Sequence, residues 1–215
     1  MKYRLLIFDW DGTIIDSAST IAECIRRAAA DLGLPVPSEQ QARHVIGLGL
    51  QDALRGTVPD LRPERMPEFV ERYRAYFRAG EEKMALFAGM RELLARLAAE
   101  RTLGIATGKS RRGLDRALDA SGLRPYFRAS RCADETQPKP HPAMLREIMA
   151  ELDVAADNAL MIGDTSHDLE MARAAGVDAL AVTYGAHAAA GLMDCGPRGC
   201  VGSVGELEQW LATHG

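Results

Sequence analysis

The chain has 215 residues, enough for one large domain or for a core with a small insertion. Hydrophobic residues make up 47% and charged residues 26%, as in ordinary globular proteins, and 26 basic against 30 acidic residues give a formal net charge of -4. Because the chain has no basic block and no apolar run of about 20 residues, we expect neither a nucleic-acid partner nor a membrane span.

A first strand is predicted at residues 3–9, where four apolar residues run into the first acid of the stretch LIFDWDGTIID. Gly12 and Thr13 break the apolar pattern, so Asp9 and Asp11 lie at the carboxyl end of a strand, where open α/β sheets bind ligands. Side chains two positions apart on an extended backbone point the same way, so both carboxylates are expected to face one pocket. A magnesium ion would relieve their repulsion, although Asp and Gly also build plain surface turns.

The following segment, residues 17–85, has helical patterns and no convincing strand. Its helices are predicted at residues 17–32, 38–46, 51–55 and 67–77, and the second is expected to begin with a capping box of Ser38 and Gln41. A stretch of about 70 residues is too long for a simple crossover between two strands. We therefore predict an all-helical domain at residues 17–85, inserted into a core formed by residues 1–16 and 86–215.

Two features of this segment allow competing interpretations. The last helix has an apolar side that we assign to core packing rather than to stacking on bases, made of Phe69, Val70, Tyr73, Tyr76 and Phe77. The Gly47-Leu48-Gly49 stretch is either a loop that reaches into a site or a plain turn between helices.

Strands and helices alternate regularly in the rest of the chain. Strands are predicted at residues 103–107, 127–130, 160–163 and 179–182, and helices at 89–99, 110–121, 142–152, 169–175 and 204–212. This alternation predicts an α/β fold with a doubly wound parallel sheet, a Rossmann-like core.

Polar clusters follow three of these strands. They are Thr107-Gly108-Lys109, Lys139, and the stretch from Asp164 to Asp168. Because parallel strands end at one edge, these groups are expected to meet Asp9 and Asp11 there. Carboxylates with a cation, a hydroxyl beside backbone amides, and a lysine suit phosphoryl transfer to a carboxylate. Taken singly, each has an ordinary alternative: a helix cap for Thr107, Asp164 or Asp168, and a solvated lysine for Lys139.

The motifs DWDGT, ATGK, PKP and GDTSHD, in this order and after the expected strands, resemble the haloacid dehalogenase superfamily of hydrolases. The resemblance spans essentially the whole chain. The inserted helical segment resembles the cap domain of the phosphoglycolate-phosphatase-like branch. It implies an inserted all-helical cap that opens and closes, with hinges near residues 16–17 and 84–89.

The resemblance also implies catalytic roles. Asp9 would attack phosphorus to form an aspartyl-phosphate, and Asp11 would protonate the leaving oxygen and then deprotonate the hydrolytic water. Lys139, rather than the neighbouring candidate Lys109, would steady the nucleophile and the phosphoryl group. The phosphate-binding residues implied by the resemblance are Thr13, Thr107 and Gly108.

A magnesium site is implied as well. Its ligands would be Asp9, the main-chain carbonyl of Asp11, and Asp164, with Asp168 supporting the site from close by. The implied activity is magnesium-dependent hydrolysis of small phosphomonoesters, with 2-phosphoglycolate as the first candidate. The implied partner is thus a small-molecule phosphoester, and the protein would be a monomer or a homodimer.

Several alternatives within the superfamily remain. A dehalogenase lacks the second aspartate of the first motif, so Asp11 argues against it. A phosphonate hydrolase needs a cap lysine, and residues 17–85 hold only Lys83, near the junction. A sugar-phosphate mutase or a pyrophosphatase stays open. The helical segment has arginines that suit either a small acidic substrate or a solvated surface: Arg26, Arg27, Arg43 and Arg55.

A non-catalytic phospho-acceptor or binding module of the receiver type is a further alternative. It would carry its acceptor on a later strand and would have no inserted segment, so the sequence favours an enzyme. Four scattered cysteines are too few for a disulfide framework and indicate a reducing cytoplasm. Cys195 and Cys200 have no second Cys/His pair to complete a metal site. His141 and His167 are assigned structural or surface roles.

Overall fold

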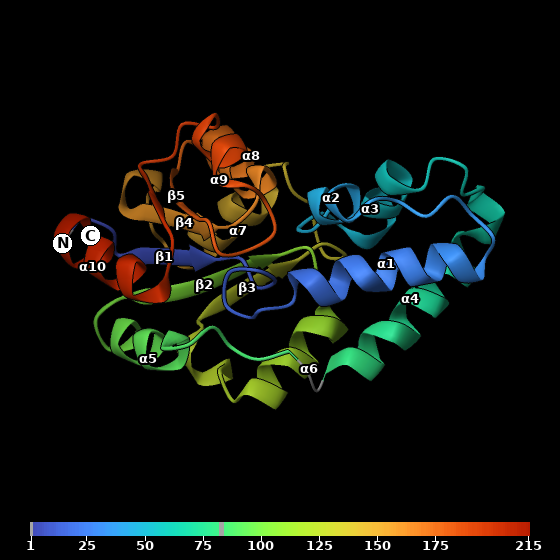
Figure 1. Ribbon diagram of the computed structural model, residues 1–215. Coiled ribbons are helices and arrows are strands. Elements are labelled where there is room, and N and C mark those ends of the chain that lie inside the picture. The colour runs from blue at the N-terminus through green and yellow to red at the C-terminus, as the bar shows by residue number, and fades with distance from the viewer. Residues whose placement is uncertain (1, 82–83) are drawn as a thin grey trace.

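The computed structural model describes residues 2–81 and 84–215. Its strands are β1 (Leu5–Phe8), β2 (Thr102–Thr107), β3 (Ala129–Cys132), β4 (Ala159–Gly163), β5 (Asp178–Val182) and β6 (Gly199–Val201). Within the described ranges these six form one parallel sheet in the order β3-β2-β1-β4-β5-β6 (Figure 1). The predicted parallel, doubly wound sheet is thus confirmed, and its order reverses between β1 and β4.

The central strand explains why the sheet is buried on both faces. All four residues of β1 are 0% exposed, and they alternate between two separate hydrophobic clusters. Leu6 and Phe8 pack against the face covered by α5 (Met90–Glu100), α6 (Arg111–Ser121) and α10 (Val204–His214). Leu5 and Ile7 pack against the opposite face, under α7 (Ala143–Glu151), α8 (Ser166–Ala175) and α9 (Ala189–Met193). The short 3-10 turns of this part are η3 (Arg124–Tyr126) and η4 (Ala156–Asn158).

Between β1 and α5 lies a separate group of helices. It consists of α1 (Ala18–Asp31), α2 (Glu39–His44), α3 (Leu50–Thr57), the 3-10 turn η1 (Pro63–Arg65) and α4 (Met66–Gly80). Ile25, Leu54 and Phe69, each at most 1% exposed, lie in a hydrophobic cluster confined almost entirely to this group. In Figure 1 the group lies beside the sheet, on the side where β1 ends. The predicted capping box of α2 is confirmed, because Gln41 N donates to Ser38 Oγ and Ser38 N donates to Gln41 Oε1.

The two connections between this group and the sheet run side by side. Ile15 forms a β-bridge with Leu86, and the backbone N–H of Asp16 donates to the carbonyl of Ala85 at 2.9 Å. The helical group is therefore joined to the rest of the chain through one narrow neck.

Some predicted elements differ from the structure at the edges of the sheet. The strand expected at residues 127–130 lies at Ala129–Cys132, and the sequence analysis missed β6 and α9. β6 has three residues and α9 has five, which is too short for an apolar period to appear. None of the helices in the described part of the chain has the length and apolar character that crossing a membrane requires.

Candidate active site

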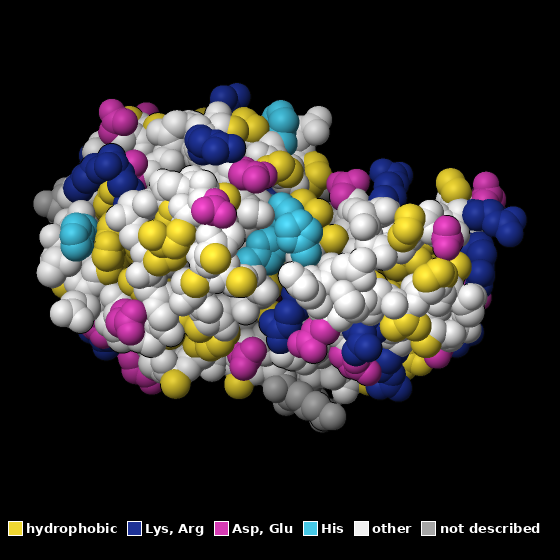
Figure 2. Space-filling model, turned by 45° about the horizontal axis from the view of Figure 1, so that its top comes forward, with side chains coloured by type: hydrophobic (Ala, Val, Ile, Leu, Met, Phe, Trp, Pro, Cys, Tyr) yellow, Lys and Arg dark blue, Asp and Glu magenta, His cyan; other side chains and the backbone are white. Residues whose placement is uncertain are grey.

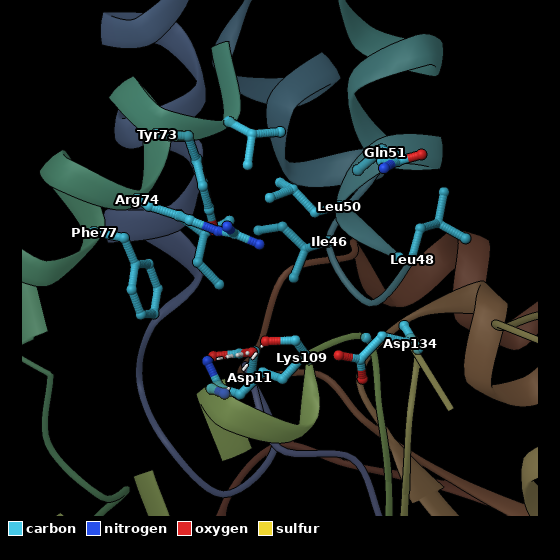
Figure 3. Close-up of a pocket in the computed structure, with 18 of the residues that line it drawn as sticks. Asp11, Ile46, Leu48, Leu50, Gln51, Tyr73, Arg74, Phe77, Lys109 and Asp134 are labelled. Atoms are coloured by element: carbon cyan, nitrogen blue, oxygen red, sulfur yellow. Dashed lines mark hydrogen bonds and ion pairs between the residues drawn. The ribbon is translucent and has the colours of Figure 1, made fainter. Parts of the chain in front are cut away.

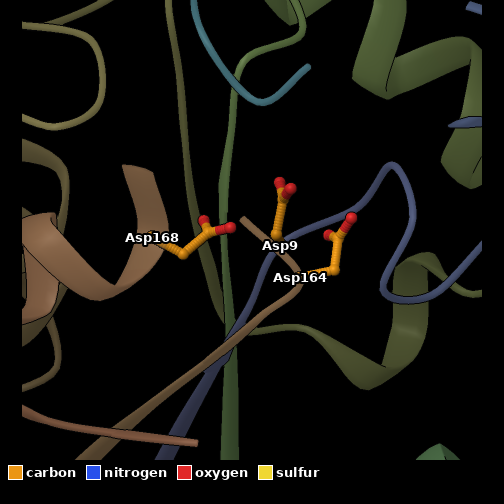
Figure 4. A group of neighbouring side chains, drawn as sticks. All are labelled: Asp9, Asp164 and Asp168. Carbon is orange, nitrogen blue, oxygen red and sulfur yellow. The ribbon is translucent and has the colours of Figure 1, made fainter. Parts of the chain in front are cut away.

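Three buried carboxylates meet where the strand order reverses. Asp9 follows β1, Asp164 follows β4, and Asp168 lies in the first turn of α8. Each is at most 1% exposed, and one oxygen from each lies within 4.8 Å of the others. Figure 4 shows the three side chains extending toward a common space. This is the sheet edge at which ligands bind in open α/β folds.

A buried lysine bridges two of these acids. Lys139 Nζ lies 2.7 Å from Asp9 Oδ1 and 2.6 Å from Asp168 Oδ1. Burial alone would lower the pKa of Lys139, but the charges of Asp168 and Asp9 outweigh this effect and raise it. Burial raises the pKa of Asp9 well above its ordinary value, and the nearby Asp168 and Asp164 raise it further, against the influence of Lys139. The group therefore holds more negative charge than its lysine neutralises.

The three acids fit a divalent cation with oxygen ligands. Three carboxylates against one lysine leave an excess of about two negative charges, which is costly in a buried site unless a cation compensates it. Asp9 Oδ2 is buried and has no hydrogen-bond partner among the described residues. Burial, together with Asp168, raises the pKa of Asp164 to about 7. Hard oxygen donors of this kind are those that Mg²⁺ prefers.

The backbone is packed tightly around Asp164. Its two carboxylate oxygens accept hydrogen bonds from Thr13 Oγ1 and from the backbone N–H of Ala186, each at 2.7 Å. A Cβ atom at Gly12 would lie 2.2 Å from Asp164 Oδ2, and one at Gly185 would lie 2.3 Å away. Only glycine fits at these two positions, so the chain fixes the orientation of this carboxylate.

Asp168 is held by its own helix. Its Oδ2 accepts from Thr165 N at 3.1 Å while its own N–H donates to Thr165 Oγ1 at 3.4 Å, which forms the capping box of α8, and Oδ2 also accepts from Thr165 Oγ1 at 2.6 Å. Asp168 can therefore cap α8 with Oδ2 and still support the predicted metal site, because its Oδ1 faces Lys139.

Asp11 lies outside the group of three carboxylates. Its Oδ1 accepts a hydrogen bond from Ser17 Oγ at 2.8 Å, and its Oδ2 lies 3.0 Å from Lys109 Nζ. Lys109 Nζ also lies 4.7 Å from the ring centroid of Phe77 on α4. Asp9 and Asp11 do line one cavity, as their spacing predicted. The sequence does not predict the contact between Asp11 and Lys109, because no local pattern relates the two residues and Lys109 was a candidate only for binding phosphate.

Of the three predicted phosphate-binding residues, Thr13 donates its hydroxyl to Asp164, whereas Thr107 and Gly108 lie near a loop of the helical group. Thr107 is fully buried, and its Oγ1 accepts from Lys109 N at 3.2 Å. A Cβ at Gly108 would lie 2.5 Å from the carbonyl oxygens of both Gly47 and Leu48. Of the two interpretations of Gly47-Leu48-Gly49, the structure therefore favours a loop that reaches the edge of the site.

A cavity of about 1030 Å³ separates the helical group from this edge. Figure 3 shows Tyr73, Arg74 and Phe77 of α4 on one side of it, with Asp11 and Lys109 beneath. The assignment of the apolar side of α4 to core packing is confirmed for Phe69, which is fully buried, and for Val70, Tyr73 and Phe77, which pack against the same hydrophobic cluster. The last three also line the cavity, which the sequence did not predict.

The four arginines weighed as substrate ligands do not line this cavity in the described part of the chain. Arg43 pairs with Glu39, and Arg55 with Asp52, within their own helices. The arginines that do line it come from α4 and α6 and were not singled out: Arg74, Arg78, Arg112 and Arg116. Lys83 lies outside the described residues.

Two histidines of the core contact the helical group. Nε2 of His167 and Nε2 of His187 donate to the carbonyl of His44, at 2.9 and 3.0 Å. The ring centroids of the three residues are 5.0 to 5.7 Å apart, and Figure 2 shows histidine side chains gathered near the middle of the face in view. His167 thus has a structural contact, as expected. His44 lies more than 120 positions before the histidines that it contacts, so no local sequence pattern reveals this cluster.

The structure thus combines a doubly wound parallel sheet, three buried acids where its strand order reverses, and a cavity under the helical group that Asp9 lines. In open α/β folds this is the place where ligands bind. The family model described as haloacid dehalogenase-like hydrolase matches residues 6–182. The chain therefore belongs to the haloacid dehalogenase-like hydrolase family, which confirms the resemblance.

Relatives with names and structures agree with this assignment. The chain is 36% identical to the probable phosphatase IndB of Dickeya dadantii, over 94% of this chain and 91% of the relative. It is 27% identical to a phosphoglycolate phosphatase of Nitrosococcus oceani, over 97% and 96% of the two chains. The crystal structure of a hydrolase from Pseudomonas syringae superposes with a TM-score of 0.90, covering 100% of this chain and 99% of the other, at 20% identity, and so shares the fold.

Proposed function

We propose that this protein is a magnesium-dependent phosphatase that hydrolyses phosphomonoesters through an aspartyl-phosphate on Asp9. The observation that carries the proposal is the state of Asp9. Its Oδ1 is paired with Lys139, while its buried Oδ2 has no hydrogen-bond partner in the described ranges. A carboxylate oxygen that has no hydrogen-bond partner, at the edge of a cavity and beside a fixed positive charge, is suited to act as a nucleophile.

The first step joins Asp9 to the phosphoryl group. An oxygen of Asp9 forms a bond to phosphorus while the bond from phosphorus to the leaving oxygen breaks. Lys139, the hydroxyl of Thr107 and the backbone N–H of Gly108 hold the phosphoryl oxygens. We assign the Mg²⁺ site to Asp9, Asp164 and the main-chain carbonyl of Asp11, with Asp168 in support. A bound ion would supply charge neutralisation around the phosphoryl oxygens.

Asp11 serves both halves of the reaction. In the first step its carboxyl proton passes to the leaving oxygen, and in the second its carboxylate takes a proton from the attacking water. Water then forms a bond to phosphorus, the bond to Asp9 breaks, and phosphate leaves. Ser17 and Lys109 hold the Asp11 side chain, which keeps it on the cavity side of Asp9.

Residues 17–85 are assigned the role of a cap over a core formed by residues 1–16 and 86–215. The narrow neck at Ile15 and Leu86 and the separate hydrophobic cluster of the helices support this division. The first substrate to test is 2-phosphoglycolate, because relatives carry that name. All four cysteines are free, in keeping with a cytoplasmic location, and a monomer or a homodimer is the expected assembly.

The proposal is tested by phosphate release from a panel of phosphomonoesters that includes 2-phosphoglycolate. We expect turnover with Mg²⁺, loss of turnover with a chelator, and recovery when Mg²⁺ is added in excess. Release that continues unchanged in the chelator, or a folded protein that hydrolyses no ester of the panel, would contradict the proposal.

The effect of Mg²⁺ on stability is expected to depend on pH. Burial raises the pKa of Asp164 to about 7 in the folded protein, so the folded state binds a proton more tightly than the unfolded state. As pH rises from the ordinary pKa of an aspartate toward about 7, the growing negative charge on Asp164 lowers the free energy of unfolding. Binding of Mg²⁺ to the carboxylate compensates this charge and restores the stability. The rise in melting temperature on adding Mg²⁺ should therefore grow between about pH 5 and about pH 7.

The measurement is thermal unfolding with and without Mg²⁺ across this range. The difference between the two conditions is used because burial lowers the pKa of His187 to about 4, and this histidine changes stability in the opposite direction. Asp164→Asn is the control, for which the Mg²⁺ effect should be small at every pH. A shift that is the same at both ends of the range would show that Asp164 does not bind the ion.

A further inference from the structure

The cavity beside the site is much larger than a two-carbon substrate needs. Its volume of about 1030 Å³ reaches the upper end of the usual size for pockets that hold drug-sized ligands, about 300 to 1,000 Å³. The leaving group of 2-phosphoglycolate has only two carbons, a methylene and a carboxylate. Closure of the cap would reduce the volume but would leave the same side chains facing the substrate.

The side chains that the helical group contributes to the cavity are mostly apolar, whereas the core side adds charged groups such as Lys109, Arg112 and Arg116. The apolar ones come from three parts of the helical group: Ile21 and Ile25 from α1, Ile46 and Leu50 from α2–α3, and Val70 and Phe77 from α4. Figure 3 shows Ile46 and Leu50 facing Tyr73 and Phe77 across the cavity. Val70, Tyr73 and Phe77 remain only partly buried although they belong to the apolar side of α4. Covering these partly exposed apolar side chains with an apolar ligand is favourable, because it removes apolar surface from water.

This wall faces the part of the substrate that leaves. In Figure 3 Ile46, Leu50 and Tyr73 lie above Asp11 and Lys109, and the ring of Phe77 lies next to Lys109, 4.7 Å from its Nζ. In the proposed reaction Asp11 gives its proton to the leaving oxygen, so the atoms attached to that oxygen must lie on the Asp11 side, under the apolar wall. The wall therefore contacts the leaving group and leaves the phosphoryl group to Lys139 and Thr107.

We propose that the cap selects phosphomonoesters whose leaving group has an apolar body of several carbons, and that 2-phosphoglycolate is a poor substrate. The inference rests on the proposed function and specifies its substrate class. Arg74 also extends into the cavity in Figure 3, so a distal anionic group on such a substrate is compatible with it.

The test is a series of n-alkyl phosphates: ethyl, butyl and hexyl, with 2-phosphoglycolate beside them. Their leaving alcohols have nearly the same acidity, so differences in kcat/KM report contacts with the cap rather than leaving-group chemistry. Each fully buried methylene contributes about 0.8 kcal/mol, or about fourfold in kcat/KM. We expect hexyl phosphate to exceed ethyl phosphate by about tenfold or more, and to exceed 2-phosphoglycolate.

A matched pair of variants locates the effect. Val70→Gln places an amide in the cavity wall, whereas Val36→Gln makes the same change at an exposed position that does not line the cavity. The ratio of hexyl to ethyl phosphate should fall about threefold or more in the first and stay unchanged in the second. Melting temperatures check that both variants fold.

The outcomes separate the two proposals. Phosphate release with a flat or falling alkyl series, or with 2-phosphoglycolate as the best substrate, would overturn the apolar selection and leave the phosphatase function standing. An unchanged ratio in Val70→Gln would also overturn it. Release from no ester at all would overturn the proposed function together with this inference.

Discussion

Replacing Asp9 by asparagine should abolish phosphate release while leaving the protein folded. The amide has the shape of the carboxylate but cannot form the aspartyl-phosphate. Loss of a covalent nucleophile costs several orders of magnitude in kcat, so we expect a fall of about a thousandfold or more. Steady-state phosphate release in saturating Mg²⁺ measures it.

Stability should not follow activity in this variant. Burial and the neighbouring acids raise the pKa of Asp9, which means that its charge is unfavourable in the folded state. Lys139 keeps Asp168 as a partner at 2.6 Å, so a neutral amide at position 9 leaves no lysine charge uncompensated. The melting temperature in chelator should therefore be equal to that of the wild type or higher.

Asp153→Asn, the same change at an exposed position, serves as the control and should keep full activity. If Asp9→Asn retained more than about a tenth of the wild-type kcat while folded, Asp9 would not be the nucleophile.

The sequence predicts the carboxyl edge of the sheet well because two independent regularities agree there. An apolar run buried on both faces marks a central strand, and parallel strands place their carboxyl ends together. Asp9 and Asp164 directly follow such runs and Thr107 ends one, so their convergence follows from topology alone. Lys139 follows the less regular β3, and its burial between two acids emerges only in the structure.

The residues around the cavity are less predictable. The apolar period of α4 identifies which side of the helix avoids water, but it does not say whether that side meets a core or a cavity. Phe69 and Phe77 belong to the same side, yet the first is fully buried and the second lines the cavity. The partner of Asp11 is equally hidden, because Lys109 follows a motif that already explains its neighbour Thr107.

Lys139→Met should cost more stability than any other single change considered for this site. Lys139 Nζ is the cation placed between Asp9 and Asp168, and the three groups are almost fully buried. Removing one partner of a buried ion pair typically costs about 3 to 5 kcal/mol, since an uncompensated charge remains. The raised pKa of Lys139 means that its contribution is fully present below the ordinary lysine pKa and is lost only as pH rises beyond it, so the effect is complete at neutral pH.

Urea unfolding in chelator measures this loss, and Lys109→Met provides the comparison. Lys109 and Asp11 are each 11% exposed and pair at 3.0 Å, at the margin of the cavity, so water limits the cost to about 1 kcal/mol. Lys139→Met combined with Asp168→Asn should recover part of the lost stability, because the second change removes a carboxylate that the first left unpaired. Strict additivity of the two changes would mean that Lys139 stabilises the fold through packing and not through its charge.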